Sequence, residues 1–267
     1  MNTNKNWQTL NYQVENGIGL LTINRPAKLN ALNIELLNEL KEVLTLIKSV
    51  DDFSVKGLIV TGEGEKSFIA GADIAEMSDM TPSDAYNFGN LGHQVTLLFE
   101  TLPIPVIACV NGFALGGGCE MAMSCDFIYG TTTAIFGQPE VKLGLIPGFG
   151  GTQRLAKIIG RNFAKEMIFT GRNVKAEEAL KLGLLTRVFE TKEAMLTEAK
   201  KVLNVIALNS PFAVSFAKKV MNEGMDLTIL EGLQLEKRQF SAIFSSEDMK
   251  EGTKAFIEKR TPQFKGK

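Results

Sequence analysis

Histidine is almost absent from this chain of 267 residues, and its scarcity removes several kinds of active site. His93 is the one histidine present. A His-rich metal centre therefore cannot form, and the H-E-x-x-H motif of zinc peptidases is missing. A Ser-His-Asp triad would have to use His93, which falls inside a helix predicted over residues 83–101 without a nucleophile elbow nearby. We expect no metal site, and the pattern favours a helix-face histidine over a catalytic base.

Cysteines are few, and neither sign of charge dominates. The three cysteines, Cys109, Cys119 and Cys125, lie in apolar runs and form no C-x-x-C pair. We interpret them as reduced core residues of a cytoplasmic protein. The 29 Lys and Arg residues nearly balance the 30 Asp and Glu residues, which gives a net charge of -1. No broad basic field favours nucleic acid or an anionic membrane, although a local basic cluster could still hold a phosphate.

Long apolar runs are also missing. No stretch reaches the roughly 18 apolar residues of a membrane span, so we expect no membrane association. The first residues, M-N-T-N-K-N-W-Q, lack the apolar core of a secretion signal. Hydrophobic residues make up 45% of the chain and charged residues 22%, which is ordinary for a globular protein with a large core.

Short strands and helices alternate along the first part of the chain. Apolar segments at residues 19–24, 57–61 and 105–110 predict buried strands. Leucines at helical spacing predict a helix from about Ile34, with Asn33 as its N-cap. Because this alternation continues to about residue 188, we predict an α/β fold with mainly parallel strands.

The end of the chain has a different pattern, in which only helices are expected. They are predicted at residues 192–206, 211–222, 230–244 and 247–259. We therefore divide the chain into an α/β body over residues 1–195 and a helical region over residues 196–267. No low-complexity linker separates the two, and no clear sequence repeat is visible.

Two glutamates stand out because nearly everything around them is apolar or small. Glu120 ends the run A-L-G-G-G-C-E, and Glu140 ends F-G-Q-P-E. A carboxylate in such surroundings is costly to bury unless its proton affinity is used. Two of them at one site suggest acid/base chemistry on a substrate held by backbone amides. The alternative is a pair of unrelated surface glutamates, one on a helix and one in a loop.

Glycine-rich junctions near these glutamates could bind negative charge. The run Gly116-Gly117-Gly118 lies between a buried strand and a helix, whose first amides lack internal partners. It is not a nucleotide loop, since G-K-S/T is absent and Met121 stands where the dinucleotide motif requires glycine. Residues 70–73, A-G-A-D, form a second strand-to-helix junction with Asp73 as a candidate cap. Residues 147–152, P-G-F-G-G-T, could wall a pocket beside the second glutamate. Each segment could instead be a purely structural turn.

A series of motifs runs in order along the chain. They are N-R-P-A-K-L-N-A-L (24–32), A-G-A-D-I (70–74), V-N-G-F-A-L-G-G-G-C-E (110–120), F-G-Q-P-E (136–140), P-G-F-G-G-T-Q-R-L (147–155) and A-F-I-E-K-R (255–260). Together they resemble the enoyl-CoA hydratase (crotonase) family, and bacterial short-chain members most closely. The resemblance covers essentially the whole chain.

The resemblance implies a fold, a reaction and an assembly. The fold would be a crotonase-like spiral of ββα repeats with a C-terminal helical region for oligomerisation, giving homotrimers or homohexamers built as dimers of trimers. The reaction would be reversible addition of water across the C2=C3 bond of a trans-2-enoyl-CoA to give a 3-hydroxyacyl-CoA. No separate cofactor is expected, because coenzyme A is part of the acyl-CoA thioester substrate.

The resemblance also assigns catalytic roles. The backbone amides of Ala72 and Gly117 would form an oxyanion hole for the thioester oxygen. Glu120 would act mainly as the base and Glu140 mainly as the acid, with one water held between them. Gly148 would contact the site near Glu140.

Coenzyme A contacts are implied at two places. In the same chain they would be Lys28, Leu29, Lys66 and Ala70, and from a partner subunit Phe256 and Lys259. One departure is visible: Ala75 follows A-D-I, where family members often have lysine. This leaves more of the phosphate contact to Lys66 and Lys259. The alternative for the three lysines is an ordinary solvated surface position.

Other readings stay open at this point. The same scaffold could isomerise a double bond or run another crotonase-family reaction, and a member of a different class would be a non-catalytic CoA-binding or assembly protein. Retention of both glutamates favours hydration, because water needs activation. The acyl chain length is not readable. Candidates to line the acyl pocket, each equally able to be ordinary core, are Phe88, Leu91, Leu97, Leu98 and Phe149.

Overall fold

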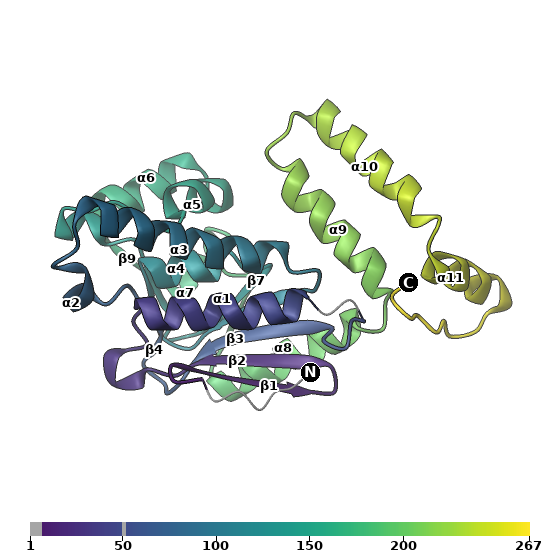
Figure 1. The fold of residues 1–267 in the computed structure, drawn as a ribbon, viewed down its shortest axis with the longest axis horizontal. Coiled ribbons are helices and arrows are strands. Elements are labelled where there is room, and N and C mark those ends of the chain that lie inside the picture. The colour runs from purple at the N-terminus through teal and green to yellow at the C-terminus, as the bar shows by residue number, and fades with distance from the viewer. Residues whose placement is uncertain (1–6, 50–51) are drawn as a thin grey trace.

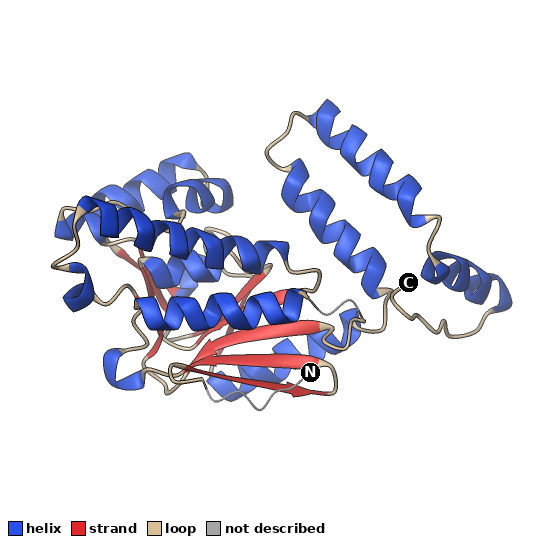
Figure 2. Cartoon of the chain, viewed as in Figure 1, coloured by secondary structure: helices blue, strands red, loops and turns tan. Residues whose placement is uncertain are grey.

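Two sheets form the centre of the protein in a computed structural model that describes residues 7–49 and 52–267 (Figures 1 and 2). The expectation about a secretion signal at residues 1–6 lies outside the described residues. The larger sheet has the order β1-β2-β3-β5-β7-β10 and the smaller sheet β4-β6-β8-β9. Strands pair in parallel except for β1 with β2 and β8 with β9. The mainly parallel arrangement predicted from the alternation is confirmed.

The strands are short, and β3 and β5 in the middle of the larger sheet are buried at every residue. In the larger sheet they are β1 (Leu10–Glu15), β2 (Ile18–Ile23), β3 (Gly57–Gly62), β5 (Val106–Val110), β7 (Phe127–Thr131) and β10 (Arg187–Phe189). In the smaller sheet they are β4 (Ser67–Ala70), β6 (Phe113–Leu115), β8 (Ile135–Gly137) and β9 (Asn173–Lys175).

From β3 to β8, successive strands alternate between the two sheets, which makes this part of the chain a spiral. Strands β3, β5 and β7 enter the larger sheet, and each is followed by a strand of the smaller sheet and then by helical structure. The helical segments are η1 (Pro26–Lys28), α1 (Ile34–Lys48), α2 (Ile74–Met77), α3 (Pro82–Thr101), α4 (Gly117–Met123), η2 (Glu140–Leu143), α5 (Gly151–Ile159), α6 (Arg161–Thr170) and α7 (Ala176–Lys181). The implied spiral of ββα repeats is confirmed.

Helices cover both faces of the larger sheet, which explains its strands of continuous apolar residues. On β3, Leu58 and Val60 face the core shared with α1, whereas Ile59 faces α8 (Lys192–Ile206). Such strands lose the apolar/polar alternation of a half-exposed sheet. Helix α1 begins as predicted, because the side chain of Asn33 accepts a hydrogen bond from the Leu36 amide at 3.0 Å.

Three helices leave the body as an arm, defined here as α9 (Pro211–Gly224), α10 (Ile229–Ile243) and α11 (Glu247–Glu258). Figure 1 shows α9 and α10 side by side as a hairpin that projects away from the sheets, with α11 beyond it. Helix α8 instead packs on the larger sheet, so the proposed boundary between residues 195 and 196 falls inside a helix that packs with the body. No helix among the described residues could span a membrane.

Candidate active site

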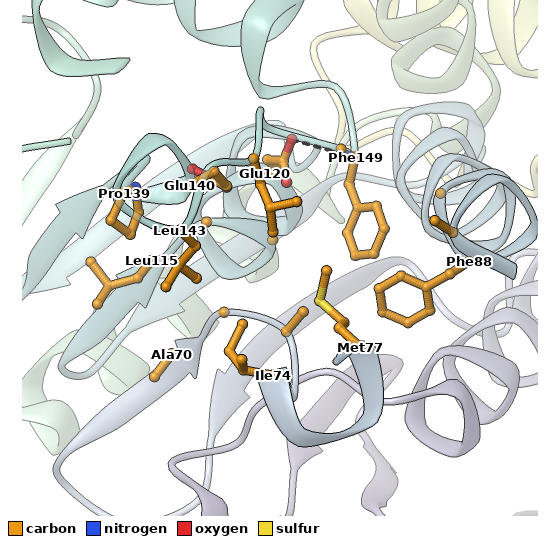
Figure 3. Close-up of a pocket in the computed structure, with 18 of the residues that line it drawn as sticks. Ala70, Ile74, Met77, Phe88, Leu115, Glu120, Pro139, Glu140, Leu143 and Phe149 are labelled. Carbon is orange, nitrogen blue, oxygen red and sulfur yellow. Dashed lines mark hydrogen bonds between the residues drawn. The ribbon is translucent and has the colours of Figure 1, made fainter. Parts of the chain in front are cut away.

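A cavity of about 300 Å³ opens between the smaller sheet, α2, α3 and the loop that precedes α5 (Figure 3). Its walls are mostly apolar and come from segments far apart in the sequence. Among the described residues that line it, Glu120 and Glu140 are the two with ionisable side chains. The cavity therefore isolates two carboxyl groups in apolar surroundings, which is the arrangement expected for acid/base chemistry.

The glycine run forms one wall of the cavity at the start of α4. Gly116 has φ +49° and its amide donates to the Gly137 carbonyl at 2.9 Å, so the chain turns sharply into the helix. A Cβ on Gly118 would lie 1.9 Å from the Ile69 carbonyl oxygen, because the helix starts directly against β4. Gly117 is the first residue of α4 and lines the cavity. Its amide has no acceptor within the helix and none elsewhere in the described chain, so it is free to bind an anion.

Ala72 offers a second free amide through its pairing with Leu32. The Leu32 amide donates to the Gly71 carbonyl at 2.8 Å, and the Asp73 amide donates to the Leu32 carbonyl at 2.7 Å. In such a parallel bridge the middle residue directs its own N–H and C=O to the opposite side. Ala72 lines the cavity, and its amide meets no acceptor in residues 7–49 or 52–267.

Asp73 does not cap α2 as expected. It occupies the N-cap position but makes no capping hydrogen bond with its side chain. Its carboxylate instead pairs with the Arg25 guanidinium at 3.2 Å. This ion pair ties the loop after β2 to the junction that carries Ala72.

Glu120 is 1% exposed and is held by the backbone of the loop before α5. Its Oε1 accepts hydrogen bonds from the amide of Phe149 at 2.8 Å, drawn in Figure 3, and from the amide of Gly151 at 2.6 Å. Burial raises the pKa of Glu120, while the two amides and the charge of Arg154 act in the opposite direction. These donors favour the ionised form of the carboxylate, whereas burial favours its protonated form.

Glu140 begins η2 and reaches the same wall of the cavity (Figure 3). Its Oε2 is buried and has no hydrogen-bond partner in the part of the chain that the structure describes. Burial, reinforced by the nearby charge of Glu120, raises the pKa of Glu140 to about 7. A Cβ on Gly116 would lie 2.8 Å from the Glu140 Oε1, so glycine is needed there for the carboxylate to reach the glycine run.

The structure brings the predicted catalytic residues together. Those that line the cavity are Ala72, Gly117, Glu120, Glu140 and Gly148. The alternative of two unrelated surface glutamates is wrong, since both carboxyl groups enter one cavity.

The residues expected to contact coenzyme A fall into three groups. Ala70 lines the cavity, and its amide donates to the Leu29 carbonyl at 3.1 Å. Lys28 and Lys66 are exposed beside that loop and that strand. Phe256 is 85% exposed on α11, and Lys259 follows at its C-cap, far from the cavity of the same chain (Figure 1).

Two of the candidates for the acyl pocket line the cavity, and three do not. Phe88 and Phe149 line it, with their ring centroids 5.2 Å apart. Leu97 is 52% exposed, while Leu91 and Leu98 pack against the core outside the cavity. His93 is exposed on α3, as the sequence predicted.

Some residues of the site carried no individual prediction. Gln138 is fully buried, and its Nε2 donates to the Gly116 carbonyl at 3.3 Å. Met77 and Leu143 add apolar walls from α2 and η2. Gln138 could have been predicted, because it lies within the F-G-Q-P-E motif. The apolar wall residues could not, because they come together only when distant segments of the chain fold.

Comparisons with known proteins agree with one another over nearly the full chain. A family model described as enoyl-CoA hydratase/isomerase matches residues 13–267. A short-chain-enoyl-CoA hydratase of Clostridium acetobutylicum is 50% identical over 246 residues, which cover 92% of this chain and 93% of that protein. A crotonyl-CoA hydratase of Syntrophomonas wolfei is 45% identical over 258 residues, or 97% and 98% of the two chains. The crystal structure of an enoyl-CoA hydratase from Bacillus anthracis superposes with a TM-score of 0.92 at 38% identity, covering 97% of this chain and 100% of that one.

Proposed function

The chain belongs to the enoyl-CoA hydratase/isomerase family, and from that premise we propose how its residues perform the reaction. It is a hydro-lyase that adds water across the C2=C3 bond of an enoyl-CoA to give a 3-hydroxyacyl-CoA. The observation that carries the proposed mechanism is the pair of carboxyl groups in one apolar cavity beside two free amides.

The amides of Ala72 and Gly117 receive the thioester oxygen. As the water oxygen bonds to C3, negative charge moves to the thioester carbonyl oxygen. Two fixed donors stabilise this charge more in the transition state than in the ground state. Because Gly117 begins α4, its amide is one of the unpaired donors at the positive end of the helix.

The two glutamates divide the proton transfers. Glu120, which two amides favour in its ionised form, removes a proton from the water that attacks C3. Glu140, whose Oε2 has no hydrogen-bond partner among residues 7–49 and 52–267, carries the proton that is delivered to C2. The product therefore gains the hydroxyl of the water at C3 and the proton of Glu140 at C2. The proton that Glu120 took from the water then passes to Glu140, which restores the pair, so the net change is the addition of one water. Because the two groups interact, they titrate as a coupled pair.

Replacement of each carboxylate tests this mechanism. We expect Glu120→Gln and Glu140→Gln each to lower turnover of crotonyl-CoA by roughly 100- to 10,000-fold, the usual range for a general acid or base. Loss of the ultraviolet absorbance of the conjugated thioester measures the rate. His93→Gln, which changes an exposed side chain, is the matched control and should keep wild-type turnover. Near-wild-type turnover by Glu140→Gln would overturn the mechanism.

The cavity fits a short acyl chain. Phe88 and Phe149 lie at the end of the cavity opposite Ala70 in Figure 3. The Phe149 ring rests on the α3 backbone so closely that a Cβ on Gly92 would lie 2.2 Å from it. Because this ring cannot retreat into α3, the two aromatic side chains limit the length of the chain. The names of the two curated relatives, short-chain and crotonyl, agree with this proposal.

A substrate series tests the chain length. We expect kcat/KM to be highest for C4 and C6 thioesters and to fall toward C16, and Phe88→Ala to raise the C8 rate relative to the C4 rate. A 3-enoyl thioester assayed beside them separates hydration from isomerisation. Equal rates from C4 to C16 in the wild-type protein would contradict the proposal.

Assembly and coenzyme A binding form the last part of the proposal. Apolar side chains on α9 and α10 are exposed, among them Met221, Leu230 and Phe240. A homotrimer, or a dimer of trimers, would cover them and would bring Phe256 and Lys259 of one subunit toward the coenzyme A of another. Within a subunit the contacts would come from Lys28, Leu29, Lys66 and Ala70. The free cysteines support a cytoplasmic location.

A further inference from the structure

Arg154 on α5 makes a set of contacts that the mechanism above does not use. Its Nε donates to Glu100 Oε1 at 2.6 Å, and its Nη1 donates to the Phe149 carbonyl at 2.8 Å. The guanidinium also lies against Gly150, where an added Cβ would be 2.0 Å from Nη1 and 3.1 Å from Cζ. The residue at 150 has φ +105° and leaves space for the guanidinium because it is glycine.

The same loop holds the carboxylate of Glu120. The Phe149 amide and the Gly151 amide, on either side of Gly150, both donate to Glu120 Oε1. Arg154 thus binds the carbonyl of a residue whose amide binds Glu120. The Arg154 side chain is 15% exposed and Glu100 is 30% exposed, so the ion pair is partly shielded from water.

We propose that Arg154, oriented by Glu100, is a positioning residue that fixes the loop 149–151 and favours the ionised form of Glu120, the base. The inference rests on the proposed role of Glu120 and extends it to residues that do not touch the substrate. Arginine suits the position because its planar group donates to Glu100 and to the Phe149 carbonyl at once, which a lysine ammonium cannot reproduce with the same geometry.

Among the described residues, Arg154 is the one positive group that acts on Glu120. The other charged and titratable groups that act on it are Glu140 on η2, Cys119 on α4 and, through the guanidinium, Glu100 on α3. Burial raises the pKa of Cys119 to about 12, so that thiol is neutral. Burial raises the pKa of Glu120, and the Arg154 charge lowers it. Removing the charge therefore raises the pKa of Glu120 further, and the base is protonated over a wider range of pH.

The pH profile of kcat/KM for crotonyl-CoA tests this inference on the full-length protein. In Arg154→Gln we expect the acid limb to move upward by about one pH unit. We expect kcat at neutral pH to fall about 10- to 100-fold, with a much smaller change in KM, because the base is misplaced while the substrate site is kept. Arg154→Lys should restore the acid limb but only part of the rate. Glu100→Gln should lower the rate without an upward shift, since the positive charge remains.

Arg172→Gln is the matched control, because Arg172 also forms ion pairs with glutamate, in its case Glu166 and Glu178, but does not contact the loop. A wild-type acid limb in Arg154→Gln, or the same shift in Arg172→Gln, would overturn the inference. If Arg154→Gln does not fold, Arg154→Lys and Glu100→Gln test the inference instead. An upward shift of the acid limb in either variant contradicts it. An active Glu120→Gln would instead disprove the proposed function, whatever Arg154→Gln does.

Discussion

The body and the arm bury their helices to very different extents. Helix α1 buries six of its side chains and α4 buries all seven of its residues, whereas α9 and α10 bury none. Yet α9 and α10 also carry large apolar residues, such as Leu230 at 73% and Phe240 at 65% exposure. An amphipathic pattern therefore specifies an apolar face, but a second surface must be present before that face is buried.

Polar groups differ between the two regions in the same way. In the body, Glu120 is held by backbone amides that come from a distant segment. On α11 and just beyond it, Arg260 pairs with Glu251 and Glu258 on the surface. Buried groups of the first kind set proton affinities for chemistry, and exposed pairs of the second kind contribute little to stability. The body therefore encloses the cavity with its two glutamates, while the arm leaves apolar side chains exposed.

The largest difference between the regions is expected from alanine at two helical glycines. Gly118→Ala places a Cβ 1.9 Å from the Ile69 carbonyl, and neither backbone can move without opening the start of α4. We expect a loss of more than about 4 kcal/mol and little folded protein. Gly232→Ala in α10 meets its nearest atom at 3.6 Å, so it should stabilise the helix by up to about 1 kcal/mol. Urea unfolding measures both. Equal effects would mean that the close approach at Gly118 does not exist.

The joint between the regions offers the next largest effect. Lys218 of α9 donates to Asp126 at 2.8 Å and to the carbonyls of Phe99 and Ile104, and its side chain is 9% exposed. Lys218→Met leaves Asp126 without its cation, so we expect a loss of about 3 kcal/mol in unfolding free energy. Lys157 forms an exposed pair with Asp226 across the same joint.

Lys157→Met is the control for the joint and should cost less than about 1 kcal/mol, because exposed pairs contribute little. Denaturant unfolding of both variants at low and high salt measures the difference. If Lys157→Met lowered the free energy of unfolding as much as Lys218→Met, burial would not explain the contribution of the Lys218–Asp126 pair.

The apolar face of α10 gives an intermediate effect on assembly. Leu230→Asp adds a charge to a surface that we propose is covered by another subunit. The free energy of association should therefore weaken by about 2 kcal/mol or more for each subunit interface that contains this residue. Sedimentation velocity over a range of protein concentrations would show the dissociation. Leu46→Asp on α1, at a position 47% exposed, should leave the assembly unchanged. A monomeric wild-type protein would remove the basis for this prediction.

Sequence patterns predicted the parts of the molecule that short-range signals determine. The continuous apolar runs became β3 and β5, the Asn33 cap begins α1, and the motifs marked both glutamates. Strand β9 has three residues, and its pairing with β8 depends on contacts that no local period encodes. The bond between Arg154 and Glu100 likewise joins residues that are 54 positions apart, and their spacing carries no sign of it.

The smallest effect separates the regions by the pH dependence of their stability. The folded protein raises the pKa of Glu140 to about 7, above its value in the unfolded chain, so ionisation of this group opposes folding as the pH rises from 4.5 to 7. Glu140→Gln should therefore stabilise the protein little at pH 5 and by on the order of 1 kcal/mol at pH 8, a figure reduced for partial burial.

Glu251 on α11 has the opposite shift, since its bonds to Arg260 lower its pKa to about 2. Its contribution is present above its unfolded pKa and is lost only as the pH falls toward 2, so Glu251→Gln should destabilise equally at pH 5 and pH 8. Thermal unfolding of both variants at the two pH values measures this, and a Glu140→Gln gain that did not grow with pH would mean that the cavity does not hold that carboxyl group in a poorly solvated state.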